Sequence, residues 1–145
     1  DAPATLRVSV EADFFPLNYP ERAELIDGSI GELSPFHATY GYYAQGVSET
    51  TATLPRGWRD RLIAVQNPNT RGAIGLCLEV HDLLVAKSIA GREKDRRFVH
   101  EAIQHRLADK SVLLDRLAAV EGIDRTTYER IRAQIEADFR AVDAG

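Results

Sequence analysis

The stretch Leu6-Arg7-Val8-Ser9-Val10-Glu11-Ala12-Asp13-Phe14-Phe15 alternates between apolar and polar residues. One set of alternate positions, from Leu6 to Ala12, is apolar, and the other set is polar. Side chains two residues apart point to the same face of a β-strand, so this period of two predicts a strand with one face packed on a core. Pro16 follows and ends the predicted strand, because proline cannot donate a hydrogen bond to a sheet.

The same strand is expected to place two carboxylates, Glu11 and Asp13, on one face. The Cα atoms of residues at this spacing lie roughly 6.5–7 Å apart. Carboxylates so close repel each other unless a cation lies between them, and sites made of oxygen ligands favour Mg²⁺ or Mn²⁺. Two solvated acids on an exposed sheet face would give the same pattern, so the spacing alone leaves both interpretations open.

The two halves of the chain differ in composition. Residues 1–80 hold all six prolines, seven of the ten glycines and four of the five tyrosines, whereas residues 81–145 are rich in Leu, Ala, Arg and Glu. This shift predicts a half built of strands and loops followed by a helical half. We therefore expect an α+β fold, with a mixed β-sheet flanked by helices and a helical C-terminal part.

Local patterns predict the individual elements of the first half. A short helix is expected over 20–26, with a turn at Asp27-Gly28. Further strands are expected over 36–47, 50–54, 61–65 and 74–80. Cys77 lies in the last of these and is predicted to be buried, because a free cysteine commonly packs as a small apolar side chain.

Capping residues predict the helices of the second half. Asp82 is expected to cap a helix that Gly91 interrupts, and a second helix is expected over 93–107. Asp109 is expected to cap a third helix, which Gly122 ends. Thr126 and Glu129 fit a capping box for a last helix, whose apolar stripe is Tyr128, Ile131, Ile135, Phe139 and Val142.

Charge and motif content exclude several classes of protein. The formal net charge of −4 argues against non-specific coating of nucleic acid. No uncharged stretch of the sequence reaches the roughly 20 apolar residues that span a membrane, and no signal peptide is visible, so a cytoplasmic location is expected. The sequence has no P-loop, Rossmann glycine motif or hydrolase nucleophile elbow, which argues against those folds.

Basic residues gather around Gly91, namely Lys87, Arg92 and Lys94, with Asp95 beside them. A lysine next to a glycine can approach a phosphate closely, and an arginine can bind a phosphate through two hydrogen bonds. A solvated charged face is the alternative interpretation. Upstream, the tyrosines of 40–43 can stack on a nucleobase or pack at a sheet edge, and His37 can serve as a base or a ligand.

Four segments of the sequence, taken in order, carry a resemblance to a known family: Ser9-Val10-Glu11-Ala12-Asp13, Gly31-Glu32-Leu33-Ser34 through Gly46-Val47, Leu54-Pro55-x-Gly57-Trp58, and His81-Asp82-Leu83 through Asp95. Together they resemble an uncharacterised bacterial family of nucleotidyltransferase-like proteins. That family is distantly related to abortive-infection nucleotidyltransferase toxins of the DNA polymerase β-like superfamily. The resemblance implies a nucleotidyltransferase-like domain over 1–107, with 108–145 as a C-terminal helical extension packed on it.

The resemblance also implies an activity, the transfer of a nucleotide from a nucleoside triphosphate to an unknown acceptor, such as RNA, a protein or a small molecule. Glu11 and Asp13 match the paired acids that hold Mg²⁺ in such enzymes, and Glu79 is the candidate for a third metal-binding acid. The residues that match the phosphate-binding element are Lys87, Arg92, Lys94 and Asp95. Lys87 is expected to contribute to catalysis by stabilising the developing charge.

One departure from the superfamily leaves the activity open. The superfamily carries a Gly-Ser turn before the paired acids, whose backbone amides hold the triphosphate, and this chain begins too late to contain that turn. The chain starts at Asp1 and has no methionine, so a missing N-terminal segment is one explanation. A non-catalytic nucleotide-binding or toxin–antitoxin protein is the alternative, as is an interaction module whose helical tail, 126–142, docks a partner.

Overall fold

The computed structural model describes Leu6 and residues 9–68 and 71–144. The chain divides after Ala52 into two compact units, which are described separately below. Each unit contains helices and a small two-stranded sheet, so the predicted α+β class with helices flanking sheet is confirmed. The sheet is divided between the units, however, since the strands form two separate pairs within the described residues.

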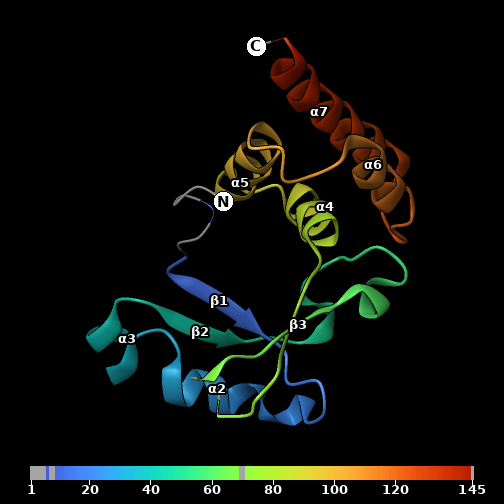
Figure 1. Ribbon diagram of the computed structural model, residues 1–145. Helices are drawn as coiled ribbons and strands as arrows, with labels where there is room; N and C mark the ends of the chain where they lie inside the picture. Colours follow the sequence, from blue (N-terminus) through green and yellow to red (C-terminus); the bar gives the residue numbers. More distant parts are fainter. Residues whose placement is uncertain (1–5, 7–8, 69–70, 145) are drawn as a thin grey trace. The chain divides into compact units, whose positions relative to one another are not determined.

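The first unit is built on a parallel pair of strands, β1 (Glu11–Phe14) and β2 (Tyr43–Gly46). The elements between and after them are η1 (Pro20–Arg22), α2 (Ala23–Ile30), α3 (Pro35–Tyr40) and η2 (Glu49–Thr51). Figure 1 shows the two strands side by side, with α2 running along them. The helix lies so close to β2 that a Cβ atom at Gly46 would collide with the carbonyl oxygen of Ala23, so only glycine fits at this position.

The second unit is mostly helical. It begins with η3 (Trp58–Arg61) and an antiparallel hairpin of β3 (Ile63–Val65) and β4 (Gly75–Cys77). Four helices follow, α4 (Val80–Ala90), α5 (Glu93–Gln104), α6 (Lys110–Ala118) and α7 (Arg125–Asp143), and these pack against one another (Figure 1). Their buried apolar side chains are Leu84, Val85, Val99, Ala102, Ile103, Leu113, Leu117, Ile131 and Ile135.

Several helix boundaries confirm the sequence prediction. Gly91 ends α4 in a left-handed conformation with φ of 66°, which a residue without Cβ adopts readily. The Asp109 carboxylate caps α6 by accepting a hydrogen bond from the backbone N–H of Val112 at 3.1 Å. The buried positions Ile131 and Ile135 show that the apolar stripe of α7 faces the interior of its own unit.

Three predicted boundaries in the helical half are wrong. Asp82 does not cap α4, because Glu79 does so, and Asp82 is instead a buried residue within the helix. The cap of α7 is Asp124, whose carboxylate accepts from the backbone N–H of Thr127, two residues before the predicted capping box. Helix α6 ends at Ala118, before Gly122.

The strand predicted over 36–47 is wrong in its first half, which forms α3. Ser34 caps this helix by accepting from the backbone N–H of His37 at 3.1 Å, and Pro35 supplies a favourable first helical residue. Gly41 then ends the helix with a positive φ of 75°. Local capping therefore outweighs the β-propensity of the aromatic residues in this segment.

Other strands are shorter than predicted. The alternation that starts at Leu6 gives a strand only over Glu11–Phe14, and Val10 is 57% exposed, so the apolar positions do not form one buried face. Arg7 and Val8 lie outside the described residues. The segment 50–54 contains the end of η2, because Ser48 and Thr51 form a capping box there.

A predicted turn, the end of one strand and the burial of one side chain also differ in the structure. Asp27 and Gly28 lie inside α2 and not in a turn. Strand β4 ends at Cys77 because Glu79 already caps α4, and Cys77 is exposed, contrary to the prediction that it is buried. None of the described helices combines an apolar surface with the length that crossing a bilayer requires.

The domain boundary predicted after residue 107 stays a prediction. Helices α6 and α7, which belong to the predicted extension, pack against α4 and α5, which precede it. The segment just before η3 is also joined to the segment just after α6. Pro55 and Val120 form an isolated β-bridge, and the backbone N–H of Arg56 donates to the carbonyl oxygen of Ala119.

Candidate functional site

The first unit carries the paired acids on the sheet face opposite to the one that packs against α2. Ala12 lies opposite Ala44 in the register, and Ala44 is buried on the face that packs against α2. Glu11 and Asp13 alternate with Ala12 along the strand, so both lie on the other face. Their neighbours across the strand pair are Tyr43 and Gln45.

A concentration of negative charge surrounds the Tyr43 hydroxyl. Burial raises the pKa of Tyr43, and the nearby carboxylates of Glu11, Glu32 and Asp13 raise it further, because a phenolate is disfavoured beside like charges. Glu32 lies just before the Ser34 cap of α3. Sequence reasoning did not identify it as a neighbour of the paired acids, although it stands in one of the four segments that carry the resemblance.

The donor set on this face suits a hard cation that keeps other ligands. Within the described residues, no group of three or more His, Cys, Asp or Glu side chains is arranged to hold a metal ion. Magnesium, however, is commonly held by one or two carboxylates together with water and substrate phosphates. Glu11 and Asp13 therefore fit a magnesium ion that takes its remaining oxygen ligands from a bound substrate.

The second unit holds the basic residues around Gly91, and a buried carboxylate organises them. Asp95 is fully buried, and it accepts hydrogen bonds from Arg92 Nε at 2.6 Å and from Lys87 Nζ at 3.3 Å. The Lys87 ammonium also lies 4.8 Å from the centre of the Phe98 ring. The turn at Gly91 thus brings the last turn of α4 against the first turn of α5.

The ionisation of Asp95 depends on these two cations. Burial raises the pKa of Asp95, but the hydrogen bonds from Arg92 and Lys87 outweigh that effect and hold the pKa below its ordinary value of 3.8. The carboxylate is therefore charged at neutral pH, and it fixes the positions of both side chains.

A hollow lies directly beside this cluster, at the start of α5. Its volume is about 420 Å³, and it is lined by Arg92, Glu93, Lys94 and Arg97. Arg92 stands at the cap position of α5 and makes no side-chain cap hydrogen bond, and the first turn also carries the acidic residues Glu93 and Asp95. Basic side chains at a helix N-terminus form an arrangement that attracts phosphate.

Glu79 takes part in a separate network at the start of α4. Its carboxylate accepts from the backbone N–H of His81 at 3.0 Å and lies 2.6 Å from His81 Nδ1. On the other side of the ring, His81 Nε2 accepts from the backbone N–H of Asp109 at 2.9 Å. Because Nε2 is an acceptor, Nδ1 carries the proton, and the neutral ring joins α4 to the cap of α6.

These hydrogen bonds also set the charge of Glu79. Burial raises the pKa of Glu79, but the hydrogen bonds from His81 and the backbone outweigh it and lower the pKa below 4.5. The assignment of Glu79 as a third metal-binding acid stays a prediction, since it belongs to the second unit and the paired acids belong to the first.

A second buried carboxylate, Asp82, was missed by sequence reasoning. Asp82 is fully buried and receives two hydrogen bonds from Arg61, at 2.8 and 2.9 Å, while Arg116 lies 3.5 Å away. These contacts join η3, α4 and α6 in one ionic cluster. Because its partners lie 21 and 34 positions away along the chain, no local pattern could have revealed the cluster.

The aromatic segment of the first unit packs largely on itself. The Phe36 ring lies 4.7 Å from that of Tyr40 and 5.4 Å from that of Tyr42, measured between centroids. His37 accepts a hydrogen bond from the backbone N–H of Leu33 through Nδ1. Base stacking by the tyrosines and a catalytic or ligand role for His37 stay predictions.

The structure thus brings the predicted site residues together in two groups. Glu11 and Asp13 share one strand face in the first unit, and Lys87, Arg92 and Asp95 form one cluster in the second, with Lys94 beside the adjoining hollow.

Comparison with known proteins identifies the family. A family described as "Nucleotidyltransferase of unknown function (DUF6036)" matches residues 26–140, which is most of the chain, and the chain therefore belongs to this family. No curated protein and no solved structure shows a significant similarity to it. The match confirms the nucleotidyltransferase-like character expected from the four segments.

Proposed function

We propose that this member of a nucleotidyltransferase family transfers a nucleotide from a nucleoside triphosphate to an acceptor in a reaction that depends on Mg²⁺ or Mn²⁺. The observation that supports the proposal best is the position of Glu11 and Asp13 on one strand face. Burial raises the pKa of Tyr43, and the negative charges of Glu11, Glu32 and Asp13 raise it further, which supports the presence of several carboxylates near this face. Such a face needs a cation before a triphosphate can approach it.

In this proposal Glu11 and Asp13 hold the metal ion. The bound ion supplies charge neutralisation and polarises the phosphate oxygens. Two carboxylates leave room for phosphate oxygens as further ligands. Glu79 is retained as a candidate third acid, although its carboxylate already accepts hydrogen bonds as the cap of α4.

The resemblance, and not an observed contact between the units, assigns the phosphates to the basic residues of the second unit. Arg92 and Lys94 line the hollow at the start of α5, and Lys87 reaches the same cluster through Asp95. Asp95 acts as a positioning residue, because it holds the Lys87 and Arg92 side chains in place and does not itself attract phosphate. Lys87 and Arg92 would stabilise the charge that develops on the leaving pyrophosphate.

The chemical step is an in-line displacement. The oxygen of an acceptor hydroxyl forms a bond to the α-phosphorus of the triphosphate, and the bond from that phosphorus to the oxygen bridging to the β-phosphorus breaks. Pyrophosphate leaves with the electron pair of that bond, and the hydroxyl proton passes to solvent. The products are a nucleotidylated acceptor and pyrophosphate.

A transfer assay with conservative variants tests the proposal. The full chain is incubated with α-labelled nucleoside triphosphates, Mg²⁺ and a mixture of RNA and protein acceptors. We expect Asp13→Asn and Glu11→Gln each to reduce labelling by at least about 100-fold, since metal stabilisation of the transferring phosphate contributes several kcal/mol. Glu24→Gln, which changes an exposed acid on α2, is the matched control. Labelling that survives in Asp13→Asn contradicts the mechanism.

A non-catalytic nucleotide-binding protein is the second candidate. It is favoured by the carboxylate of Glu79, the candidate third acid, which is already engaged as the cap of α4 and with His81. Calorimetry with Mg²⁺ and each nucleoside triphosphate separates the two functions, because binding without release of pyrophosphate would identify a sensor. The bacterial origin, the distant relationship to abortive-infection toxins and a toxin–antitoxin role rest on the resemblance of the four segments and are proposed on that basis alone.

A further inference from the structure

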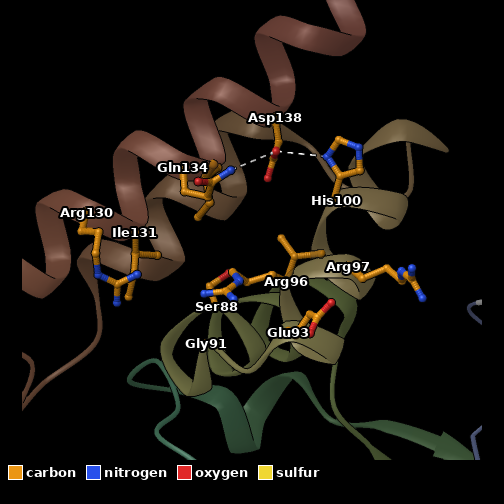
Figure 2. A pocket seen from close by; sticks show the side chains of 12 residues that line it. Ser88, Gly91, Glu93, Arg96, Arg97, His100, Arg130, Ile131, Gln134 and Asp138 are labelled. Atoms are coloured by element: carbon orange, nitrogen blue, oxygen red, sulfur yellow. Dashed lines mark hydrogen bonds and ion pairs between the residues drawn. The ribbon is translucent and has the colours of Figure 1, made fainter.

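A cavity in the second unit has a lining that does not include Lys87. Its volume is about 500 Å³, and it is enclosed by residues of α4, α5 and α7 (Figure 2). This volume lies within the range of ordinary small-molecule sites. Helix α7 lines the cavity with Arg130, Gln134 and Asp138. These residues follow one another at intervals of four and therefore lie on one side of the helix.

One part of the cavity lining is cationic. Arg96 from α5 and Arg130 from α7 both line it, and Arg97 lies at the rim shared with the neighbouring hollow. None of these three guanidinium groups forms an ion pair with a described residue, although Glu93 also lines the cavity. Arginines without a carboxylate partner in a concave site are suited to an anionic ligand.

A different part of the lining is a polar cluster built around a buried carboxylate. Asp138 Oδ1 accepts from His100 Nδ1 at 3.1 Å and from Gln134 Nε2 at 3.2 Å, as Figure 2 shows. Both hydrogen bonds go to the same oxygen, so Asp138 Oδ2 keeps its capacity to accept from a ligand. The charge of a buried carboxylate is costly unless donors surround it, and a ligand N–H would add one.

Apolar side chains back the cavity. Val99, Ile131 and Ile135 lie behind it and are almost completely buried, so the accessible part of the lining comes mainly from the longer polar side chains. Along α7, Arg130 and Asp138 are eight residues apart, which corresponds to about 12 Å along the helix axis. The cavity therefore presents cations and a hydrogen-bond acceptor over a length comparable to that of a mononucleotide.

We propose that this cavity binds a nucleoside monophosphate, with its phosphate on Arg96 and Arg130 and an N–H group of its base donating to Asp138 Oδ2. The formal net charge of −4 and the size of the cavity favour a single nucleotide over a nucleic acid strand. The inference does not depend on Glu11 and Asp13, because every residue that carries it belongs to the second unit.

Binding measurements on the full chain test this site. Each of the four ribonucleoside monophosphates and inorganic phosphate alone is titrated by calorimetry in the presence of EDTA, which removes any metal-dependent site from the measurement. We expect at least one nucleotide to bind, and to bind more tightly than phosphate. The absence of measurable binding by all five probes at millimolar concentration would overturn the proposal.

Variants assign the two parts of the ligand. Arg130→Ala and Arg96→Ala are each expected to weaken nucleotide binding at least about tenfold, because each removes a charged hydrogen-bond donor. Asp138→Asn and Gln134→Ala are expected to weaken nucleotide binding but to leave the affinity for inorganic phosphate unchanged. If Asp138→Asn fails to fold, Gln134→Ala still tests the part of the cavity around Asp138.

The matched control is Arg132→Ala. Arg132 belongs to the same helix, is paired with Glu136 and does not line the cavity. It is expected to bind as the unmodified chain does. Equal losses in Arg132→Ala and Arg130→Ala, or binding unaffected by Arg96→Ala and Arg130→Ala, would overturn the assignment. Asp13→Asn should bind the monophosphate normally even if it abolishes transfer, so the two proposals fail separately.

Discussion

At the scale of single residues, Asp95 shows how a buried charge can organise a basic site. A carboxylate with no exposed surface is stable only when donors satisfy it, and here Arg92 and Lys87 do so from two different helices. The same contacts prevent the two cations from taking many alternative rotamers. A phosphate arriving at the hollow would therefore meet cations that are already positioned.

We predict that Asp95→Asn lowers the free energy of unfolding by about 1–3 kcal/mol, because it leaves the partly buried Lys87 without its counter-charge. Urea unfolding at neutral pH measures this loss. Asp115→Asn, which changes an exposed carboxylate on α6, is the control and should unfold like the unmodified chain. Equal stability of the two variants would show that the cluster contributes nothing.

The pH dependence has a defined sign. The pKa of Asp95 is lower in the folded chain than its ordinary value of 3.8, so its contacts stabilise the fold fully above that value. Their contribution is lost as the pH falls from about 4 through the folded-state pKa. The difference in stability between the unmodified chain and Asp95→Asn should therefore shrink in acid.

At the scale of elements, the start of α4 depends on one side chain that satisfies several donors. Glu79 accepts from the backbone N–H groups of His81 and Asp82 and from the His81 ring. The ring in turn accepts from the backbone of Asp109 at the start of α6. Two helix N-termini are thus coupled through one imidazole.

We predict that Glu79→Ala lowers the free energy of unfolding by about 1–2 kcal/mol, the usual cost of losing a helix cap, and that Glu79→Gln loses less because it keeps an acceptor. Thermal and urea unfolding measure both. Because hydrogen bonds hold the pKa of Glu79 below 4.5, this contribution should also be lost as the pH falls below that value. If Glu79→Gln folds normally but loses Mg²⁺-dependent transfer, Glu79 binds the metal.

Helices proved more predictable from the sequence than strands. The cap at Asp109, the break at Gly91 and the inward stripe of α7 follow from local patterns, which residues within two turns determine. The strands of the first half depend on pairing between distant segments. Thus 35–40 forms a helix because Ser34 and Gly41 cap it, although its aromatic residues favour strand.

The candidate site divides in the same way. Spacing alone predicted that Glu11 and Asp13 lie on one strand face, and the segment 81–95 predicted that basic residues gather around Gly91. No local pattern marks the Asp82 cluster, the contact of His100 with Asp138 or the cavity of α7, because their partners lie 21 to 38 positions apart. Such contacts arise only when helices pack.

At the scale of the whole molecule, the two units differ greatly in how much apolar surface they bury. The second unit contains nine of the ten buried apolar residues among those described, and the first contains only Ala44. In the first unit Leu25 and Leu33 are 63% and 90% exposed. Burial of apolar area is the main source of folding free energy, so the second unit should hold most of the stability of the chain.

We predict that a fragment of residues 53–145 is helical and unfolds cooperatively, whereas a fragment of residues 1–52 shows no cooperative transition. Far-ultraviolet circular dichroism with urea titration distinguishes them. Leu117→Ala should destabilise the larger fragment by about 2–5 kcal/mol, the cost of a cavity at a fully buried leucine, which would show that the fragment keeps its native core. Cooperative unfolding of residues 1–52 alone would contradict this view, because the strand that carries Glu11 and Asp13 would then be stable without the helical unit.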